Sequence, residues 1–162
     1  MAGIAARATW ILIPLVVALA AVAAWTFVQL RDEQALADDR QAALDAAGTH
    51  AVDLLSLNYK SVDADVARIL ATSTGPARAE YAANAVKLKD TTLANKVVQN
   101  GVLRSAGLVS LANGTAKVLV VADVDIRWDG ANTPAQKRFY RWSMDLSKVG
   151  GTWLVSKAVQ VV

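Results

Sequence analysis

The 162-residue chain contains no cysteine and a single histidine, His50. The lack of cysteine excludes a disulfide framework and thiol chemistry, although it leaves an exported location open. A lone histidine excludes zinc motifs built on histidine pairs and weakens any Ser-His-Asp scheme. The sequence also has no glycine-rich phosphate loop or Walker pattern, which argues against an ATP-driven motor. We therefore predict a non-enzymatic protein with no catalytic, cofactor-binding or metal-binding residues.

Charged residues are absent from residues 8–30, between Arg7 and Arg31. A helix of that length spans roughly 34 Å, compared with about 30 Å for the hydrocarbon core of a bilayer. Trp10 and Trp25 lie near the two ends of the run, where aromatic rings favour the headgroup region. The alternative is a cleaved secretory signal, whose apolar segment normally has about 7–15 residues. The longer run favours a retained transmembrane helix.

The distribution of basic residues predicts the orientation of this helix. Arg7 precedes it without any acidic residue, whereas both signs of charge follow it. The positive-inside rule then places the N-terminus in the cytoplasm. We expect a short cytoplasmic N-terminus (1–7), a single-pass plasma-membrane helix (8–30), an extended juxtamembrane helix (31–60) and the remainder of an extracytoplasmic domain (61–162).

The part of the chain after residue 30 carries a net charge of only +2. A domain with so little net charge lacks the strongly basic surface that is typical of nucleic-acid binding. Lys87, Lys89 and Lys96 form a loose basic cluster that is typical of a solvated surface. We therefore expect no nucleic-acid partner.

Helical patterns occupy the first part of the predicted domain. No proline or glycine occurs between Pro14 and Gly48, so one helix can continue from the membrane into water. Its apolar residues between positions 44 and 55 are expected to pack on the protein's own core. His50 is expected to be half exposed there, close to Gly48.

Two shorter helices are predicted next, over residues 64–73 and 77–89. Ser61 or Asp63 can cap the first, and Asp65 favours its positive N-terminus. The sequence Thr-Gly-Pro at 74–76 ends it, with Gly75 as a left-handed cap. Asp63 and Asp65 fall on different faces of a helix, so they do not predict a paired-carboxylate site.

The pattern then changes to a period of two, which indicates strands over residues 97–111, 116–128, 138–149 and 152–162. Gly101 and Gly107 predict bulges or bends in the first strand. Asn113-Gly114 is a strong signal for a two-residue hairpin. On the last strand, Trp153, Val155, Val159 and Val161 are expected to share one face.

These patterns predict an α+β fold, with three helices packed on a curved four-stranded antiparallel sheet. The same order of elements occurs in the NTF2-like (cystatin-like) fold. On the second strand, Asp123 and Asp125 are expected to form cross-strand pairs with Arg138 or Arg141.

Several short motifs, in this order and spacing, resemble the actinobacterial Mce-associated membrane proteins. The motifs are DLLSLNY (53–59), VDAD (62–65), TGP (74–76), Tyr81, AGLVS (106–110), AKVLV (116–120) and GTWLVS (151–156). The resemblance implies an accessory or stabilising subunit of an Mce-type lipid-import complex of the cell envelope. The implied partners are MCE-domain proteins, the permease and ATPase subunits of the transporter, and membrane lipids.

The alternative is a pocket protein, because the NTF2-like fold also contains small enzymes of the isomerase and dehydratase type. A pocket between helices and sheet is then expected, with His50 or Asp65 as the acid or base. Its predicted walls are aromatic: Tyr59, Tyr81, Tyr140, Trp128 and Trp142. The same cone would serve a lipid-binding module. Burial of His50 or Asp65 with a shifted pKa beside an open cavity would favour a pocket protein.

Overall fold

The computed structural model describes the backbone of residues 2–161, and the side chains of residues 19, 22, 25–27, 29–31 and 33–161. The chain forms two compact units, Met1–Asp39 and Arg40–Val162. Helix α1 (Ala2–Leu55) contributes residues 2–39 to the first unit and residues 40–55 to the second.

The predicted membrane helix, residues 8–30, lies mostly outside the described side chains, although its backbone is helical. Among the residues that are described, no helix offers a stretch both long and apolar enough to cross a bilayer. The membrane span stays a prediction from the sequence.

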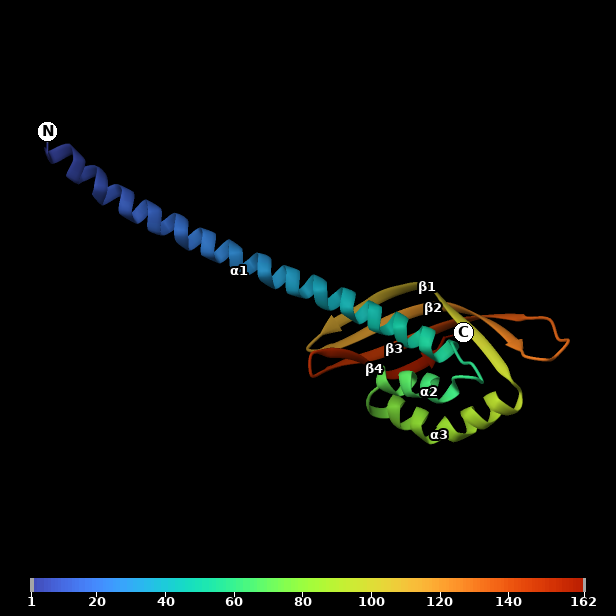
Figure 1. Ribbon diagram of the computed structural model, residues 1–162. Helices are drawn as coiled ribbons and strands as arrows, with labels where there is room; N and C mark the ends of the chain where they lie inside the picture. The colour runs from blue at the N-terminus through green and yellow to red at the C-terminus, as the bar shows by residue number, and fades with distance from the viewer. Residues whose placement is uncertain (1, 162) are drawn as a thin grey trace. The chain divides into compact units, whose positions relative to one another are not determined.

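The second unit is an α+β domain, as predicted (Figure 1). After α1 come two shorter helices and four strands, which form one antiparallel sheet in the order β1-β2-β3-β4. The elements are α2 (Val62–Ala71), α3 (Gly75–Ala94), β1 (Val97–Ala112), β2 (Thr115–Trp128), β3 (Gln136–Val149) and β4 (Thr152–Gln160).

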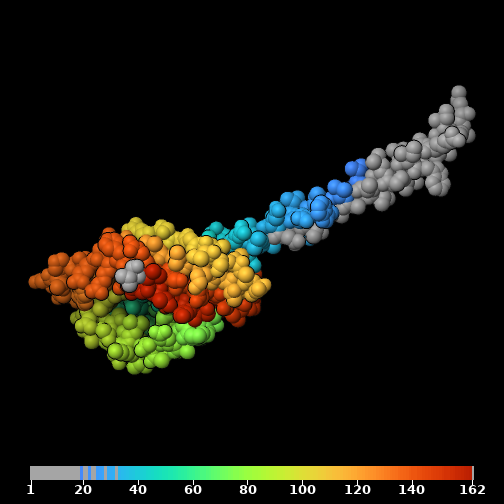
Figure 2. All heavy atoms as spheres, turned by 180° about the vertical axis from the view of Figure 1, so that it is seen from behind, coloured from blue at the N-terminus to red at the C-terminus, as the bar shows by residue number. Residues whose placement is uncertain are grey.

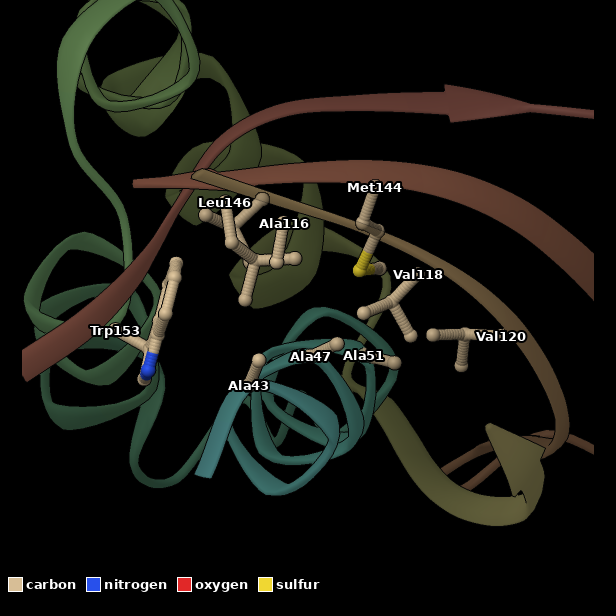
Figure 3. Packing of buried hydrophobic residues seen from close by; sticks show 10 residues of the cluster. Ala43, Ala47, Ala51, Ala116, Val118, Val120, Met144, Leu146 and Trp153 are labelled. Atoms are coloured by element: carbon tan, nitrogen blue, oxygen red, sulfur yellow. The ribbon is translucent and has the colours of Figure 1, made fainter. Parts of the chain in front are cut away.

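The main core lies between α1 and the sheet (Figure 3). Ala43, Ala47 and Ala51 recur every four residues on α1, and each is fully buried. They face larger buried side chains from β2, β3 and β4, namely Val118, Val120, Met144, Leu146, Trp153 and Val155. Because small helical residues let a helix approach the sheet closely, this interior is filled without bulky groups on α1. The expected own-core packing of residues 44–55 is confirmed.

The sheet follows the predicted alternation over most of its length. Residues 116, 118, 120, 122, 124 and 126 of β2 are all buried. The predicted hairpin is confirmed: Asn113 and Gly114 have φ values of 51° and 70°, as a tight hairpin turn of this type requires. Strand β1 has two irregularities, but they are not at the predicted positions: Gly101 and Gly107 pair regularly with β2, and the register shifts lie between Leu103 and Ser105 and between Leu108 and Ser110.

Strand β4 differs from the prediction. Trp153 and Val155 are buried, but Val159 and Val161 are 46% and 44% exposed. A register shift against β3 leaves Ser156 as an extra residue, because Val155 pairs with Leu146 and Lys157 with Asp145. One extra residue turns the following side chains to the opposite face of a strand, so the expectation for Val159 and Val161 was wrong.

The ends of the short helices also differ from expectation. Helix α2 begins at Val62 and ends at Ala71, followed by Thr72 as its C-cap. Gly75 has a φ of +51°, but it is the first residue of α3 rather than the cap of α2. The turn between the helices has three residues, as predicted, but it lies two residues earlier in the chain, at residues 72–74.

Candidate functional site

His50 lies in a buried polar cluster that joins the three helices. Its side chain is fully buried, so the expectation of a half-exposed histidine was wrong. The Nδ1 atom is 2.8 Å from Oγ1 of Thr72, at the end of α2. The Nε2 atom is 3.3 Å from the hydroxyl of Tyr81 on α3. The imidazole thus connects α1 to both neighbouring helices.

The hydrogen bonds of Thr72 indicate which group donates and which accepts in each hydrogen bond of the cluster. Its hydroxyl lies 3.0 Å from the carbonyl oxygen of Arg68, which can only accept, so the hydroxyl donates there. We therefore assign Thr72 Oγ1 as the acceptor of a hydrogen bond from the Nδ1–H of His50. The other ring nitrogen, Nε2, is left to accept from the hydroxyl of Tyr81. One chain of hydrogen bonds therefore runs from Tyr81 on α3 through His50 on α1 to Thr72 at the end of α2.

Both titratable members of the cluster are neutral at physiological pH. Burial lowers the pKa of His50 to about 4. Burial, together with the charge of Glu80, raises the pKa of Tyr81 to about 12. A neutral imidazole with both nitrogens engaged in the protein interior is a structural connector, and it is a poor general base.

A cavity of about 230 Å³ opens among the same three helices. Five aliphatic side chains and two polar ones line it: Leu54, Leu57, Val66, Ile69, Leu88, Tyr81 and Asn84. Tyr81 thus belongs both to the polar cluster and to the cavity wall. This hollow lies within the helical layer and not in the cone between helices and sheet, where the alternative hypothesis placed a pocket.

Asp65 is buried but belongs to a different network. Its carboxylate accepts a hydrogen bond from the backbone N–H of Asn58 at 2.7 Å and pairs with Arg68 Nη2 at 2.8 Å. The hydroxyl of Ser61 also donates to it, at 3.2 Å. These contacts stabilise the turn before α2. Asp63 is exposed and forms an ion pair with Lys89, so the two aspartates make no joint site.

The other aromatic residues predicted for a pocket do not meet His50. Tyr140 and Trp142 stack on each other with ring centroids 5.1 Å apart. Together with Trp128 they pack against a second buried cluster on the sheet. Tyr59 donates its hydroxyl to Asp129 at 2.5 Å. The space between α1 and the sheet is occupied by the core side chains.

The outer face of the sheet carries an exposed apolar patch. We use the term outer-face patch for Leu119, Val121, Phe139, Val159 and Val161. Figure 2 views the domain from the side on which the strands, yellow to red, form much of the surface.

Charged pairs surround this patch, but neither Asp123 nor Asp125 has a predicted partner. Asp123 pairs with Arg104 of β1 at 2.6 Å, rather than with Arg138 or Arg141. Asp125 pairs with Lys137 of β3 at 3.7 Å. The prediction failed because of the register between β2 and β3: Arg138 lies opposite Val124, on the other face of the sheet from Asp123 and Asp125, and Arg141 lies opposite Val121. Within the described part of the chain, no group of three His, Asp or Glu side chains could hold a metal ion.

The burial of His50 had a signal in the sequence that our prediction did not use. His50 follows Ala47 by three residues and Ala43 by seven, which places it on the buried stripe of α1. Its partners had no comparable signal, because Thr72 and Tyr81 are 22 and 31 residues away.

Comparison with known proteins identifies the family. The family model described as "Uncharacterized protein Rv1363c/MT1408-like" matches residues 1–162. The chain belongs to this family. It is 26% identical over 133 residues to the uncharacterized protein Rv1363c of Mycobacterium tuberculosis, which covers 81% of this chain. The match spans 51% of that relative, so the chain covers about half the length of the curated protein.

The solved structures similar to this chain share its fold. The periplasmic domain of DotI matches with a TM-score of 0.60 and 16% identity, over 75% of this chain and 94% of that one. CagV of Helicobacter pylori, a VirB8 homologue of a type IV secretion system, matches with a TM-score of 0.61 and 7% identity, over 75% and 97%. An NTF2-like protein involved in plasmid conjugation matches with a TM-score of 0.51 and 14% identity, over 76% and 49%. The domain therefore has the expected NTF2-like fold, and the likeness extends to periplasmic domains.

Proposed function

We propose that this chain is a non-catalytic accessory subunit of a multi-protein complex of the cell envelope. Its NTF2-like domain lies outside the cytoplasm and docks through the outer-face patch. The exposed apolar patch is the observation that carries the proposal, because soluble monomers seldom expose contiguous apolar surface without a partner. The likeness to periplasmic domains supports the extracytoplasmic location.

Strand pairing brings the members of the patch together. Val121 lies opposite Arg141, next to Phe139 on the same face of β3. Val161 donates its backbone N–H to the carbonyl of Arg141 at 2.8 Å, which places the end of β4 beside them. Phe139 is 70% exposed, the highest value in the patch. A ring this exposed on a rigid sheet is suited to be an interface anchor.

Most of the charges around the patch form pairs. Lys117 contacts Asp145 at 2.6 Å, in addition to the pairs formed by Asp123 and Asp125. Among the described residues Arg141, which lies opposite Val121 within the patch, forms no ion pair, so this surface carries a small excess of positive charge. It is suited to a protein partner with an apolar centre and a mixed polar rim.

The specific complex that we propose is an Mce-type lipid importer. The support is the resemblance of the chain's motifs to Mce-associated membrane proteins and the charge-free run at residues 8–30, which would anchor the subunit. MCE-domain proteins, paired permease subunits and the ATPase are then the expected assembly. The same arrangement places the chain as a single-pass protein of the plasma membrane, with its N-terminus in the cytoplasm.

The state of His50 supports a role without catalysis. Its pKa of about 4 keeps the imidazole uncharged at neutral pH, so it is no general acid there, and both nitrogens bond to the protein's own side chains. Asp65, the other candidate acid, is held by Arg68 and a backbone N–H. The burial of His50 beside a cavity does favour a second candidate, a ligand-binding module of the helical layer.

Affinity purification in mild detergent tests the accessory role. The full-length wild-type chain should co-purify with MCE-domain and permease subunits. Phe139→Ser should reduce that recovery about tenfold, as expected for loss of an interface anchor. Val86→Ser is the matched control, since Val86 is also 70% exposed but lies on α3. If the wild type purifies without transporter subunits under every condition, the proposal fails.

A further inference from the structure

We propose that the uncovered end of strand β3 binds an acidic, extended segment of a protein partner, which adds to the sheet as a further strand. The binding site is the open edge, by which we mean residues 136–139 of β3. The proposal specifies the chemistry of the partner that docks at the outer-face patch, and in that respect it rests on the proposed function.

The open edge extends beyond the strand that covers the rest of β3. Strand β2 pairs with β3 as far as Gln136, whereas β4 pairs with it only as far as Trp142. One further hydrogen bond joins the N–H of Val161 to the carbonyl of Arg141. In Figure 1 the orange hairpin of β2 and β3 extends past the end of β4. Within the described chain, positions 136–139 therefore have no strand on this side.

The backbone groups of the open edge point away from β2. The carbonyl of Arg141 points toward β4, because it accepts the hydrogen bond of Val161. Alternate residues of a strand direct their N–H and C=O groups to the same side, so those of Phe139 and Lys137 point that way as well. Every residue of the open edge is exposed. An added strand can therefore form backbone hydrogen bonds with both Phe139 and Lys137.

The other edges of the sheet are protected. Strand β1 is partly covered by residues 57–59, with the N–H of Gln99 bonded to the carbonyl of Leu57 at 2.7 Å, and it has two register shifts. Strand β4 pairs at Val155 with residues 72–74 and has a register shift as well. The open edge has no such described cover, and β2 pairs with it in unbroken register. Because covers and bulges are what prevent sheet edges from pairing with other chains, this segment is left as a regular pairing site.

The charge of the open edge favours an acidic partner over a second copy of the chain. Lys137, Arg138 and Arg141 are basic, and among the described residues only Lys137 has an acidic partner, Asp125 at 3.7 Å. If two copies paired in antiparallel fashion about Phe139, Lys137 of one copy would lie opposite Arg141 of the other. Like charges in opposite positions destabilise a strand pair, whereas opposite charges stabilise it. An acidic strand is therefore the complementary occupant.

The open edge is continuous with the outer-face patch. Phe139 belongs to both, and Lys137 and Arg141 lie on the same face of β3 because they alternate with it along the strand. A strand added beside β3 would direct every second side chain to this face. One partner segment can thus contact the apolar patch and the basic residues together.

Peptide photo-crosslinking on the full-length chain in mild detergent tests the proposal. The probes are two short capped peptides, one of alternating valine and glutamate and one of alternating valine and lysine, each with the same terminal benzophenone. Mass spectrometry maps the labelled positions. The glutamate peptide should label residues 136–141 in a saturable manner, and the lysine peptide about tenfold less. The difference should shrink in about 1 M salt, where the Debye length is about 3 Å.

Matched variants separate the contribution of the backbone from that of the charge. Lys137→Pro removes an N–H that points away from β2 and should abolish the label, whereas Lys137→Gln keeps the N–H and should retain most of it. Arg141→Glu should lower labelling by the glutamate peptide about tenfold, which keeps the test valid if Lys137→Pro does not fold. Lys87→Glu, the same change of charge on the exposed surface of α3, should leave it unchanged.

The result for the peptides is separable from the result for the accessory role. Equal labelling by the two peptides, labelling confined to other parts of the chain, or no effect of Arg141→Glu would overturn the open edge as an acidic-strand site, even if transporter subunits co-purify. Labelling as expected, without co-purification of any transporter subunit, would support this site and overturn the accessory role alone.

Discussion

The two interfaces that the buried stripe of α1 makes in the domain, with the sheet and with α2 and α3, contrast in composition and packing. On the side of the sheet, Ala43, Ala47 and Ala51 pack against Val118 and Met144 in a filled apolar interior. On the side of α2 and α3, His50 takes part in a buried polar cluster next to a cavity. One helix thus contributes small residues to a close contact on one side and polar linkage on the other.

The difference indicates which part of the domain has room for a ligand. A closely packed interface tolerates no added volume, because the surrounding atoms cannot shift without strain. The helical layer is joined by directional hydrogen bonds instead, and its residual space can be occupied. We therefore expect the two sides to respond differently to added volume, to pH and to the loss of a polar group.

Gly101→Ala should give the largest effect of the substitutions, because it adds volume on the filled side. A Cβ at Gly101 would lie 2.5 Å from Cβ of Leu55 and 3.1 Å from the carbonyl oxygen of Val52. We expect the free energy of unfolding to fall by about 3 kcal/mol in chemical denaturation. Gly107→Ala is the matched control on the same strand, since no heavy atom lies within 4 Å of its added Cβ. Equal losses in the two variants would contradict the close contact.

Lowering the pH should destabilise the contact of α1 with α2 and α3, through His50. Its pKa falls from 6.5 to about 4 on folding, so the unfolded chain binds the proton more readily. The free energy of unfolding is then highest above pH 6.5. It falls by about 3 kcal/mol as the pH decreases toward 4. The difference between wild type and His50→Gln, followed by denaturation at each pH, isolates this contribution. A difference that does not vary with pH would exclude burial of a neutral imidazole.

Tyr81→Phe should have an intermediate effect. It removes the donor to His50 Nε2 and leaves a buried acceptor without a partner, which costs about 1–2 kcal/mol. Tyr59→Phe removes a hydrogen bond to Asp129 at the surface, and about 0.5 kcal/mol or less is expected. The two losses of stability are compared by thermal unfolding of both variants and the wild type. A larger loss in Tyr59→Phe would contradict the buried hydrogen bond between Tyr81 and His50.

Phe139→Ser should have the smallest effect on stability. Its side chain is 70% exposed on the outer face, so unfolding should change by no more than about 0.5 kcal/mol. Circular dichroism and denaturation of the isolated protein provide the measurement. A substantial destabilisation would mean that Phe139 contributes to the fold, and its role as a docking residue would lose its basis.

The fold could be predicted from local patterns to a large extent. The alternation of β2 and the Asn113-Gly114 turn depend on neighbouring residues, and both are confirmed. The face of Val159 could not be predicted, because the bulge at Ser156 depends on how β4 pairs with β3. The partners of Asp123 and Asp125 were missed for a similar reason, because they depend on the register between strands.

The site was less predictable than the fold. The heptad-like spacing of His50 with the alanine stripe indicates burial, but its partners come from separate helices. A cavity depends on what three helices fail to fill, which no single segment determines. The outer-face patch likewise requires the register of three strands, together with the bulge that exposes Val159.

The central claim, docking through the outer face of the sheet, can be tested most directly by a photo-crosslinker at a single position. A benzophenone amino acid replaces Phe139 in the full-length chain in living cells, and replaces Val86 in the control. The account predicts crosslinks from position 139 to a subunit of a lipid-transport complex, and none to that subunit from position 86. Crosslinks to that subunit from position 86 but not from position 139 would contradict it.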